Sequence, residues 1–372
     1  MSEFLLLATH NESGFSRSER TMVHATAGVL TLTAPAVRAD NDSGPSFWVS
    51  SAQAPRLLVS ASGVTTGLVL GTPYGIGASC AELAVNDWPA MEARELYRRL
   101  GGAYTAVLAT QTHGQVKVLS DLFGQQPLFL FEAPGMVALG SSIRILLDNL
   151  PQIPRALDLG QLSEFIVTGV NGRTKSFFSH IVRVPGNSAL IIDCERMTLQ
   201  RSEGADFRAY LETASELTPL HMREDLARVL EDCTREQRCA YSLSGGVDSS
   251  LLLAVAAQKK DSGKPDCFTA GTPYGLDALF AVKAARYCQA ALHQVDMAAD
   301  SPSIDVAASL TRLHGGPVHI TGSSVGYAFL CRQARQSGFA GVINGHGEDF
   351  ATVSGHASIC RVAIPWSKDK VN

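Results

Sequence analysis

Short apolar runs separated by turn residues fill the first half of the chain. Gly28–Thr33 and Arg56–Ser60 are rich in β-favouring residues, and glycine, proline, asparagine and aspartate set them apart. The apolar run Phe4–Leu7 predicts a first strand, and a helix is expected around Met91–Leu100. Three more strands are expected at Tyr104–Thr110, Gln115–Ser120 and Leu128–Phe131. This strand-rich pattern predicts a sheet-on-sheet or α+β domain.

Helices and strands alternate after Pro219. Residues Leu220–Cys233 place Leu226, Val229 and Leu230 on one face, as an amphipathic helix does. The elements expected next are strand Cys239–Leu243, helix Ser249–Gln258, strand Cys267–Ala270, helix Ala278–Gln289, strand His293–Val295, helix Val325–Gln336 and strand Gly341–Ile343. The alternation predicts a parallel, doubly wound sheet that binds ligands at the carboxyl ends of its strands.

The two patterns are separated by a polar stretch at residues 194–217. We interpret it as a linker between a domain of residues 1–193 and a domain of residues 218–372. A chain of 372 residues suits two domains.

Composition narrows the class of protein without naming a function. Hydrophobic residues make up 45% of the chain and charged residues 18%, which fits a globular protein. The formal net charge is −4 and no dense run of lysine and arginine occurs, so neither a nucleic acid nor a membrane is expected as a partner. The sequence contains no Cys-x-x-Cys pair, signal peptide or long apolar stretch. We therefore expect a cytoplasmic protein with reduced, buried thiols.

The strongest chemical pattern follows the strand expected at Cys239–Leu243. Residues Ser244–Ser250 read SGGVDSS, between an apolar strand and an apolar helix. Small residues at Ser244, Gly245 and Gly246 let backbone N–H groups close around phosphate oxygens at the positive end of the helix. The pattern lacks the Gly-Lys-Ser/Thr ending of kinase-type P-loops, which argues against simple γ-phosphate transfer.

Polar side chains in the same segment suit a metal–nucleotide. The Asp248 carboxylate suits Mg²⁺ bound to the phosphates, and the hydroxyls of Ser244 and Ser249 add donors. The alternative is a glycine-rich turn in which Asp248 only caps the helix.

Residues Ser244–Ser250 resemble the pyrophosphate-binding loop of the ATP pyrophosphatases, and the wider chain resembles asparagine synthetase B-type proteins. Residues Gly345–Asp349, which read GHGED, resemble the second phosphate loop of that family. The resemblance implies that Asp349 is a Mg²⁺ ligand and that ATP is split to AMP and pyrophosphate. A surface turn capped by Asp349 is the alternative.

The resemblance also implies how the nucleotide would be held. Asp248 and Asp349 would converge on one Mg–pyrophosphate from separate strands. The backbones of Leu243, Ala270 and Gly345 would line the adenine. Asp277 occupies the place of a family acidic residue, or it caps the helix that follows.

The first half resembles the glutaminase domain of the same family, an Ntn-hydrolase-like, class II glutamine amidotransferase-like sandwich. The segments that carry this resemblance are Gly101–Tyr104, Asp121–Leu128, Gly140–Ser142 and Val184–Gly186. Glutamine-hydrolysing members use an N-terminal cysteine, whereas residue 2 here is serine and the first cysteine is Cys80. We expect a degenerate domain without glutaminase activity. A processed Ser2 acting as nucleophile is the alternative.

Relatives without glutaminase activity include β-lactam and carbapenam synthetases and lasso-peptide cyclases. His346 resembles the lasso-cyclase version of the second loop. The leading hypothesis is therefore an ATP-dependent, AMP-forming carbon–nitrogen ligase that closes a lactam or macrolactam in natural-product biosynthesis. Its partners would be a carboxylate and amine substrate, such as a precursor peptide, together with a leader protease.

The end of the chain departs from the family pattern. The family uses a lysine well beyond the second loop, but only Lys368 and Lys370 follow Asp349 here, in a stretch that fits a solvated tail. We expect a truncated chain, a completing subunit or a lost amide-forming activity. The short C-terminus favours a non-catalytic or partner-dependent ATP-binding protein as one alternative. An ammonia-dependent asparagine synthetase is the other. Among the histidines, His314, His319 and His346 are expected near the site, and His293 is expected at a strand end.

Overall fold

The computed structural model forms two compact units. The first comprises Met1–Pro73, Gly77–Asp206 and Thr311–His319, and the second comprises Tyr74–Ile76, Phe207–Leu310 and Ile320–Asn372. The structure describes residues 4–9, 21–26, 29–33, 46–51, 56–59, 65–75, 95–97, 100–109, 115–169, 172, 174–204, 218–235, 237–258, 263–272, 275–297, 308, 311, 316–317, 322–345 and 361–362. The chain passes between units after Asp206, within the range expected as a linker.

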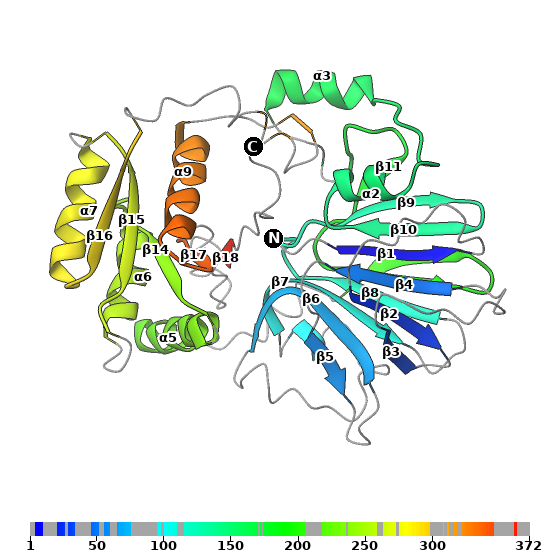
Figure 1. Ribbon diagram of the computed structural model, residues 1–372, viewed down its shortest axis with the longest axis horizontal. Helices are drawn as coiled ribbons and strands as arrows, with labels where there is room; N and C mark the ends of the chain where they lie inside the picture. The colour runs from blue at the N-terminus through cyan, green and yellow to red at the C-terminus, as the bar shows by residue number, and fades with distance from the viewer. Residues whose placement is uncertain are drawn as a thin grey trace. The chain divides into compact units, whose positions relative to one another are not determined.

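Two antiparallel sheets build the first unit (Figure 1). The seven-stranded sheet has the order β11 (Ile181–Arg183), β9 (Phe129–Ala133), β10 (Met136–Gly140), β1 (Phe4–Thr9), β4 (Ser46–Ser51), β2 (Thr21–Thr26) and β3 (Val29–Thr33). The six-stranded sheet has the order β13 (Thr198–Glu203), β12 (Ser188–Asp193), β8 (Gln115–Ser120), β7 (Leu100–Ala109), β6 (Thr65–Gly75) and β5 (Arg56–Val59).

Successive side chains of β1 point to opposite faces of the seven-stranded sheet, and both faces are covered. Phe4 and Leu6 belong to a core shared with residues of the six-stranded sheet, so the two sheets pack face to face. Leu5 and Leu7 point to the opposite face, where they pack with residues of α2 (Ile143–Asn149). The strand-rich sequence pattern therefore corresponds to the sandwich that the family resemblance implied.

Two sequence-based boundaries in this unit are corrected. Strand β7 begins at Leu100 rather than Tyr104, because Gly101 and Gly102 continue the strand; helix is present at residues 95–97. Residues 198–203, expected in the linker, form β13. That strand is polar because it lies at the sheet edge with most of its side chains exposed, so it lacks the alternation of a half-buried strand. Helix α3 (Leu159–Thr168) was not expected.

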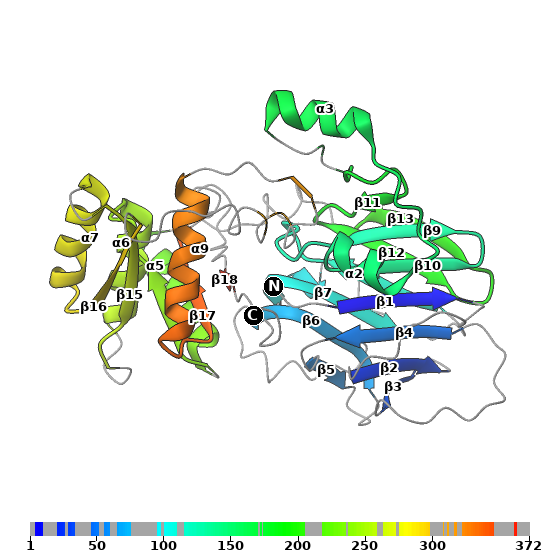
Figure 2. The same ribbon diagram turned by 45° about the horizontal axis from the view of Figure 1, so that its top comes forward.

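The second unit contains a five-stranded sheet with helices on both faces (Figures 1 and 2). Its order is β16 (Ala291–Asp296), β15 (Asp266–Gly271), β14 (Cys239–Ser242), β17 (Gly341–Ile343) and β18 (Arg361–Val362). The first four strands are parallel, and β18 is antiparallel to β17. The sheet confirms the expected doubly wound α/β domain.

The helices cover this sheet as its connections require. Helices α6 (Val247–Ala257) and α7 (Leu276–Tyr287) follow successive strands on one face, and α9 (Gly322–Gln336) lies on the other (Figure 1). Helix α5 (Pro219–Arg235) buries Leu226, Val229 and Leu230, the face that its sequence predicts. Among the residues that the structure describes, no helix combines the length and apolar character needed to cross a membrane. The six described cysteines are free thiols, all buried except Cys288.

Candidate functional site

The turn between β14 and α6 is held together by its own hydroxyl groups. The Ser244 and Ser249 hydroxyl oxygens lie 3.0 Å apart, and the backbone N–H of Ser244 donates to Ser249 Oγ over 3.3 Å. Ser249 Oγ donates to the Gly246 carbonyl over 3.2 Å. Ser249 is buried, and its hydroxyl stabilises the loop through these contacts.

Gly245 is required by both conformation and space. Its φ is +80°, in the left-handed region that favours glycine. A Cβ at this position would lie 2.6 Å from the Asp277 carbonyl oxygen and 2.7 Å from the Ala281 nitrogen. Backbone atoms of α7 therefore pack directly against the loop, which fixes its path.

The N-terminus of α6 presents unpaired donors beside an exposed carboxylate. Gly246 is the N-cap and gives the helix no side-chain hydrogen bond. Asp248 lies in the first turn and is exposed, so the alternative in which it caps the helix is wrong. The N–H groups of Val247 and Asp248 precede the first available intrahelical acceptor. The helix therefore offers an anion its positive end.

Gly345 brings the second loop segment onto this turn. A Cβ at Gly345 would lie 3.0 Å from the Ser249 nitrogen and 3.1 Å from Asp248 Cβ. Gly345, the second residue after β17, therefore packs closely against the start of α6. Several predicted residues lie outside the described part of the chain: Asp349, His346, Lys368, Lys370, Ser2, His314 and His319.

The remaining predicted nucleotide contacts follow neighbouring strands. Leu243 and Ala270 lie at the carboxyl ends of β14 and β15, and Gly345 follows β17, so the fold brings all three to one edge of the sheet. Leu243 is buried and its N–H donates to the Phe268 carbonyl over 2.8 Å. Asp277 lies inside α7 and Gly275 is the N-cap, so the prediction that Asp277 caps this helix is wrong.

A second contact at this edge was not predicted from the sequence. The side chain of Asn344, which is 9% exposed, donates from Nδ2 to the Tyr327 hydroxyl of α9 over 2.9 Å. It joins a residue that follows β17 to a helix on the opposite face from α6. Neither residue belongs to a recognisable motif, so only the fold reveals the pair.

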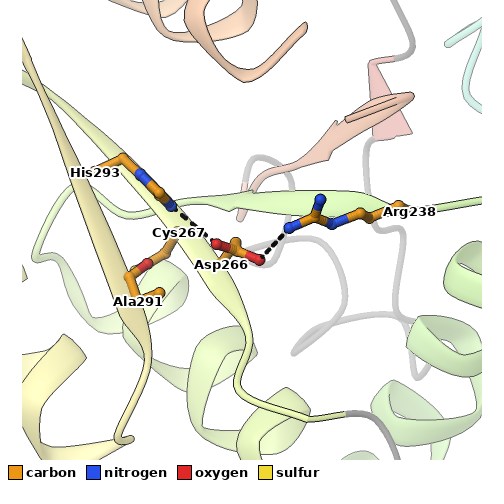
Figure 3. A network of polar contacts seen from close by, with 5 residues as sticks. All are labelled: Arg238, Asp266, Cys267, Ala291 and His293. Atoms are coloured by element: carbon orange, nitrogen blue, oxygen red, sulfur yellow. Dashed lines mark hydrogen bonds and ion pairs between the residues drawn. The ribbon is translucent and has the colours of Figure 1, made fainter. Parts of the chain in front are cut away.

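His293 belongs to a separate polar network. Its Nε2 lies 2.9 Å from Asp266 Oδ1, and Arg238 donates to Asp266 Oδ2 over 3.0 Å (Figure 3). Burial raises the pKa of Asp266, but hydrogen bonds from His293 and Arg238 outweigh this and the pKa is lowered. Arg238 and Asp266 lie at the amino ends of β14 and β15, so the network stabilises the sheet away from the candidate site.

The first unit contains a loop of different character after β8. The Asp121 carboxylate accepts N–H groups from Phe123, Gln125 and Gln126 over 3.1, 2.9 and 2.8 Å. Burial raises the pKa of Asp121 to about 6, and these backbone donors oppose the rise. A Cβ on Gly186 would lie 2.3 Å from the Gly124 nitrogen. Two of the segments that resemble a glutaminase domain therefore pack against each other through their glycines.

The fold and the loops define a two-domain protein with an Ntn-hydrolase-like sandwich and a parallel α/β nucleotide-type domain. The glutamine amidotransferase domain family matches residues 77–202, and the asparagine synthase family matches residues 221–353. Together these matches support an asparagine synthetase-like family and a ligase-type enzyme that uses ATP.

Solved structures show more distant similarity. Glutamine phosphoribosylpyrophosphate amidotransferase from B. subtilis is 13% identical over 88% of this chain and 92% of that chain, with a TM-score of 0.30. NMN synthetase from Francisella tularensis is 16% identical over 34% of this chain, with a TM-score of 0.24, and this chain spans 54% of its length. No curated protein matches the chain.

Proposed function

We propose that this protein is an amide-forming ligase that activates a carboxylate with ATP and releases AMP and pyrophosphate. The observation that carries the proposal is the packing of Gly345 against Asp248 and Ser249. It places the start of the GHGED segment on the SGGVDSS loop, as a nucleotide held between two phosphate loops requires.

The residues at the site fit a Mg–nucleotide. The exposed Asp248 carboxylate is an oxygen ligand of the kind that Mg²⁺ prefers, and it stands beside the unpaired N–H groups of α6. Among the described residues, no group of three histidine, cysteine, aspartate or glutamate side chains could hold a metal ion by itself, in the absence of a nucleotide. ATP phosphates and Asp349 would supply the remaining oxygens. When bound, Mg²⁺ would neutralise charge on the departing pyrophosphate.

The proposed reaction has two bond exchanges. A substrate carboxylate oxygen attacks the α-phosphorus of ATP, and the bond to the pyrophosphate oxygen breaks. The Ser244–Ser249 turn and the α6 N-terminus would orient the leaving pyrophosphate and stabilise its charge. An amine then attacks the acyl carbon of the acyl-adenylate, AMP leaves, and a base takes the proton from nitrogen.

A narrower form of the proposal assigns lactam or macrolactam closure, as in lasso-peptide or β-lactam biosynthesis, without glutaminase activity. Ser2 in place of cysteine and His346 in the second loop favour it. A precursor peptide would then supply both carboxylate and amine, and a leader protease would act with the ligase. The asparagine synthase match instead favours a second candidate, an ammonia-dependent asparagine synthetase.

Carboxylate-dependent exchange of labelled pyrophosphate into ATP tests the proposal. We expect exchange with Mg²⁺ and a cognate acid, and none without the acid. Binding of MgATP without exchange for precursor peptides, β-amino acids and aspartate would favour an ATP-binding protein that depends on a partner subunit. Asparagine formed from aspartate and free ammonia would overturn the lactam assignment.

A further inference from the structure

The two residues that follow β17 are held from both faces of the sheet. Asn344 donates to the Tyr327 hydroxyl of α9 over 2.9 Å. Gly345, the next residue, packs against Asp248 and Ser249 of α6, where a Cβ would approach to 3.1 and 3.0 Å. A movement of Asn344 toward or away from α9 would therefore change how Gly345 lies on the phosphate loop.

The Tyr327 hydroxyl is itself fixed by a second partner. Cys331 lies one turn further along α9, with its side chain buried. Burial raises the pKa of its thiol to about 11, and a hydrogen bond with Tyr327 opposes that rise. The Tyr327 hydroxyl therefore interacts both with the Asn344 amide and with the Cys331 thiol of its own helix.

The strand contributes little to this position. Strand β17 has three residues, all buried, and it ends at Ile343. Asn344 is the first residue beyond the ladder, and its side chain is almost fully buried. A buried amide that loses its partner costs more than an average hydrogen bond contributes. The Asn344 side chain therefore makes this short strand end in one defined way.

We propose that Tyr327 is a positioning residue for the nucleotide, acting through Asn344 to hold Gly345 against Asp248. The proposal rests on the proposed function, because it assumes that ATP binds where the two loops meet. Tyr327 does not touch the phosphates. Tyr327 fixes the backbone at Asn344, where the second loop segment starts. It thereby sets the distance between Gly345 and Asp248.

The test removes one atom. Tyr327→Phe keeps the ring that packs in α9 and deletes the hydroxyl, and Tyr287→Phe makes the same change at a tyrosine of α7 that is 88% exposed. We expect Tyr327→Phe to weaken MgATP binding about tenfold, measured by calorimetry, because the part-buried hydrogen bond that positions Asn344 is lost. In the exchange assay KM for ATP should rise while kcat changes less. Tyr287→Phe should bind as the unmodified protein does.

Variants of Asn344 separate positioning from general stability. Asn344→Ala should weaken binding as Tyr327→Phe does, and the double variant should be no weaker than the worse single variant. Asn344→Asp, whose carboxylate accepts from the Tyr327 hydroxyl, should recover binding to within about threefold. A purely structural role would lower the melting temperature of each variant but leave the affinity of the folded protein unchanged.

Two results would overturn the proposal: unchanged MgATP affinity in Tyr327→Phe, or additive losses in the double variant. If Tyr327→Phe does not fold, the Asn344→Ala and Asn344→Asp pair decides, because equal affinities in these two exclude a positioning role. Failure of the proposed function is distinguishable, because it would leave MgATP binding intact and abolish only pyrophosphate exchange. An unmodified protein that does not bind MgATP would contradict both proposals.

Discussion

The loop after β8 and the turn after β14 contain the same kinds of residue but use their aspartate and their backbone N–H groups differently. Each follows a strand, contains a glycine with positive φ, and carries an aspartate near backbone N–H groups. In the first unit, Asp121 is 1% exposed and accepts three N–H groups of its own loop. In the second unit, Asp248 is exposed, and no ion pair joins it to the part of the chain that the structure describes.

This difference separates a structural loop from the proposed binding loop. In the Asp121 loop, three backbone N–H groups donate to the carboxylate of the loop itself, so few N–H groups are left to bind a ligand. The Ser244–Ser249 turn satisfies only its hydroxyls internally and leaves the first N–H groups of α6 facing outward. A glycine-rich turn with an aspartate is therefore a binding site only where the fold leaves donors and carboxylate unpaired.

Replacing the exposed carboxylate should give the largest effect on function. Asp248→Asn keeps the size of the side chain but removes a charged metal ligand. We expect pyrophosphate exchange to fall about 10³-fold, equivalent to about 4 kcal/mol. The melting temperature should hardly change, because Asp248 is exposed and asparagine keeps the Cβ that packs near Gly345. Asp225→Asn, which removes a half-buried carboxylate of α5 that pairs with Arg228, is the control and should exchange normally. Equal losses in both variants would refute a special role for Asp248.

A methyl group at Gly245 should damage the fold of the binding loop. The left-handed φ and the approach to α7 backbone together predict a loss of about 3–4 kcal/mol in the free energy of unfolding for Gly245→Ala. Gly246→Ala is the control, because its φ is −72° and its Cβ would meet only Ser244 Oγ, at 3.3 Å. Chemical denaturation of both variants measures the difference. Similar stabilities would mean that the turn does not pack on α7 as described.

The sequence predicted what periodicity and local chemistry can specify. Strands Gln115–Ser120 and Gly341–Ile343 were predicted to the residue, because alternating or fully buried runs have clear ends. The loop at Ser244–Ser250 was recognisable because glycine and aspartate at that spacing are local features. Its internal arrangement was not: nothing in the sequence shows that Ser249 turns inward.

Features that depend on distant contacts escaped the sequence. Strand β13 is an exposed edge strand without alternation, so it could not be told from a polar linker. Helix α3 exposes Leu159, Ile166 and Val167, so its apolar residues do not mark one buried face. The Tyr327–Asn344 bond joins residues 17 positions apart on different elements. Such pairs become visible only when the sheet brings them together.

The buried carboxylate should make the first unit sensitive to pH. The pKa of Asp121 rises from 3.8 to about 6 on folding, so the folded state holds the proton more tightly. This stabilisation is fully present below about pH 4 and is lost as the pH rises through 6, at most about 3 kcal/mol. Protection from hydrogen exchange in peptides from residues 115–133, corrected for intrinsic rates, should fall as the pH rises from about 4 through 6. Asp121→Asn should lack it.

A half-buried aspartate of the same unit, Asp193, supplies a control whose pKa shift has the opposite sign. The pKa of Asp193 is lowered, chiefly by the backbone N–H of Arg196. Its contribution is therefore present above its ordinary pKa and is lost as the pH falls. In the unmodified protein, protection from hydrogen exchange near Asp193 should fall on acidification, and Asp193→Asn should abolish that fall. The change in protection between pH 4 and 6 that Asp121 causes should remain in this variant. Parallel pH profiles for the unmodified protein and Asp121→Asn would show that Asp121 does not hold a proton on folding.

The smallest effect is expected at the opposite end of the α/β sheet, where Asp266 is paired with Arg238 and His293 (Figure 3). The Arg238 and His293 side chains are 63% and 42% exposed, so solvent screens both interactions. Asp266→Asn should lower the free energy of unfolding by about 0.5–1 kcal/mol. Because the pKa of Asp266 is lowered on folding, the difference from the unmodified protein should shrink as the pH falls below about 4 and vanish below the lowered pKa.

Pyrophosphate exchange should not change in Asp266→Asn, since this carboxylate is paired with Arg238 and His293, whereas the Asp248 carboxylate is the proposed ligand of Mg²⁺. A loss of exchange in Asp266→Asn comparable to that in Asp248→Asn would show that pairing does not distinguish the two ends of the sheet.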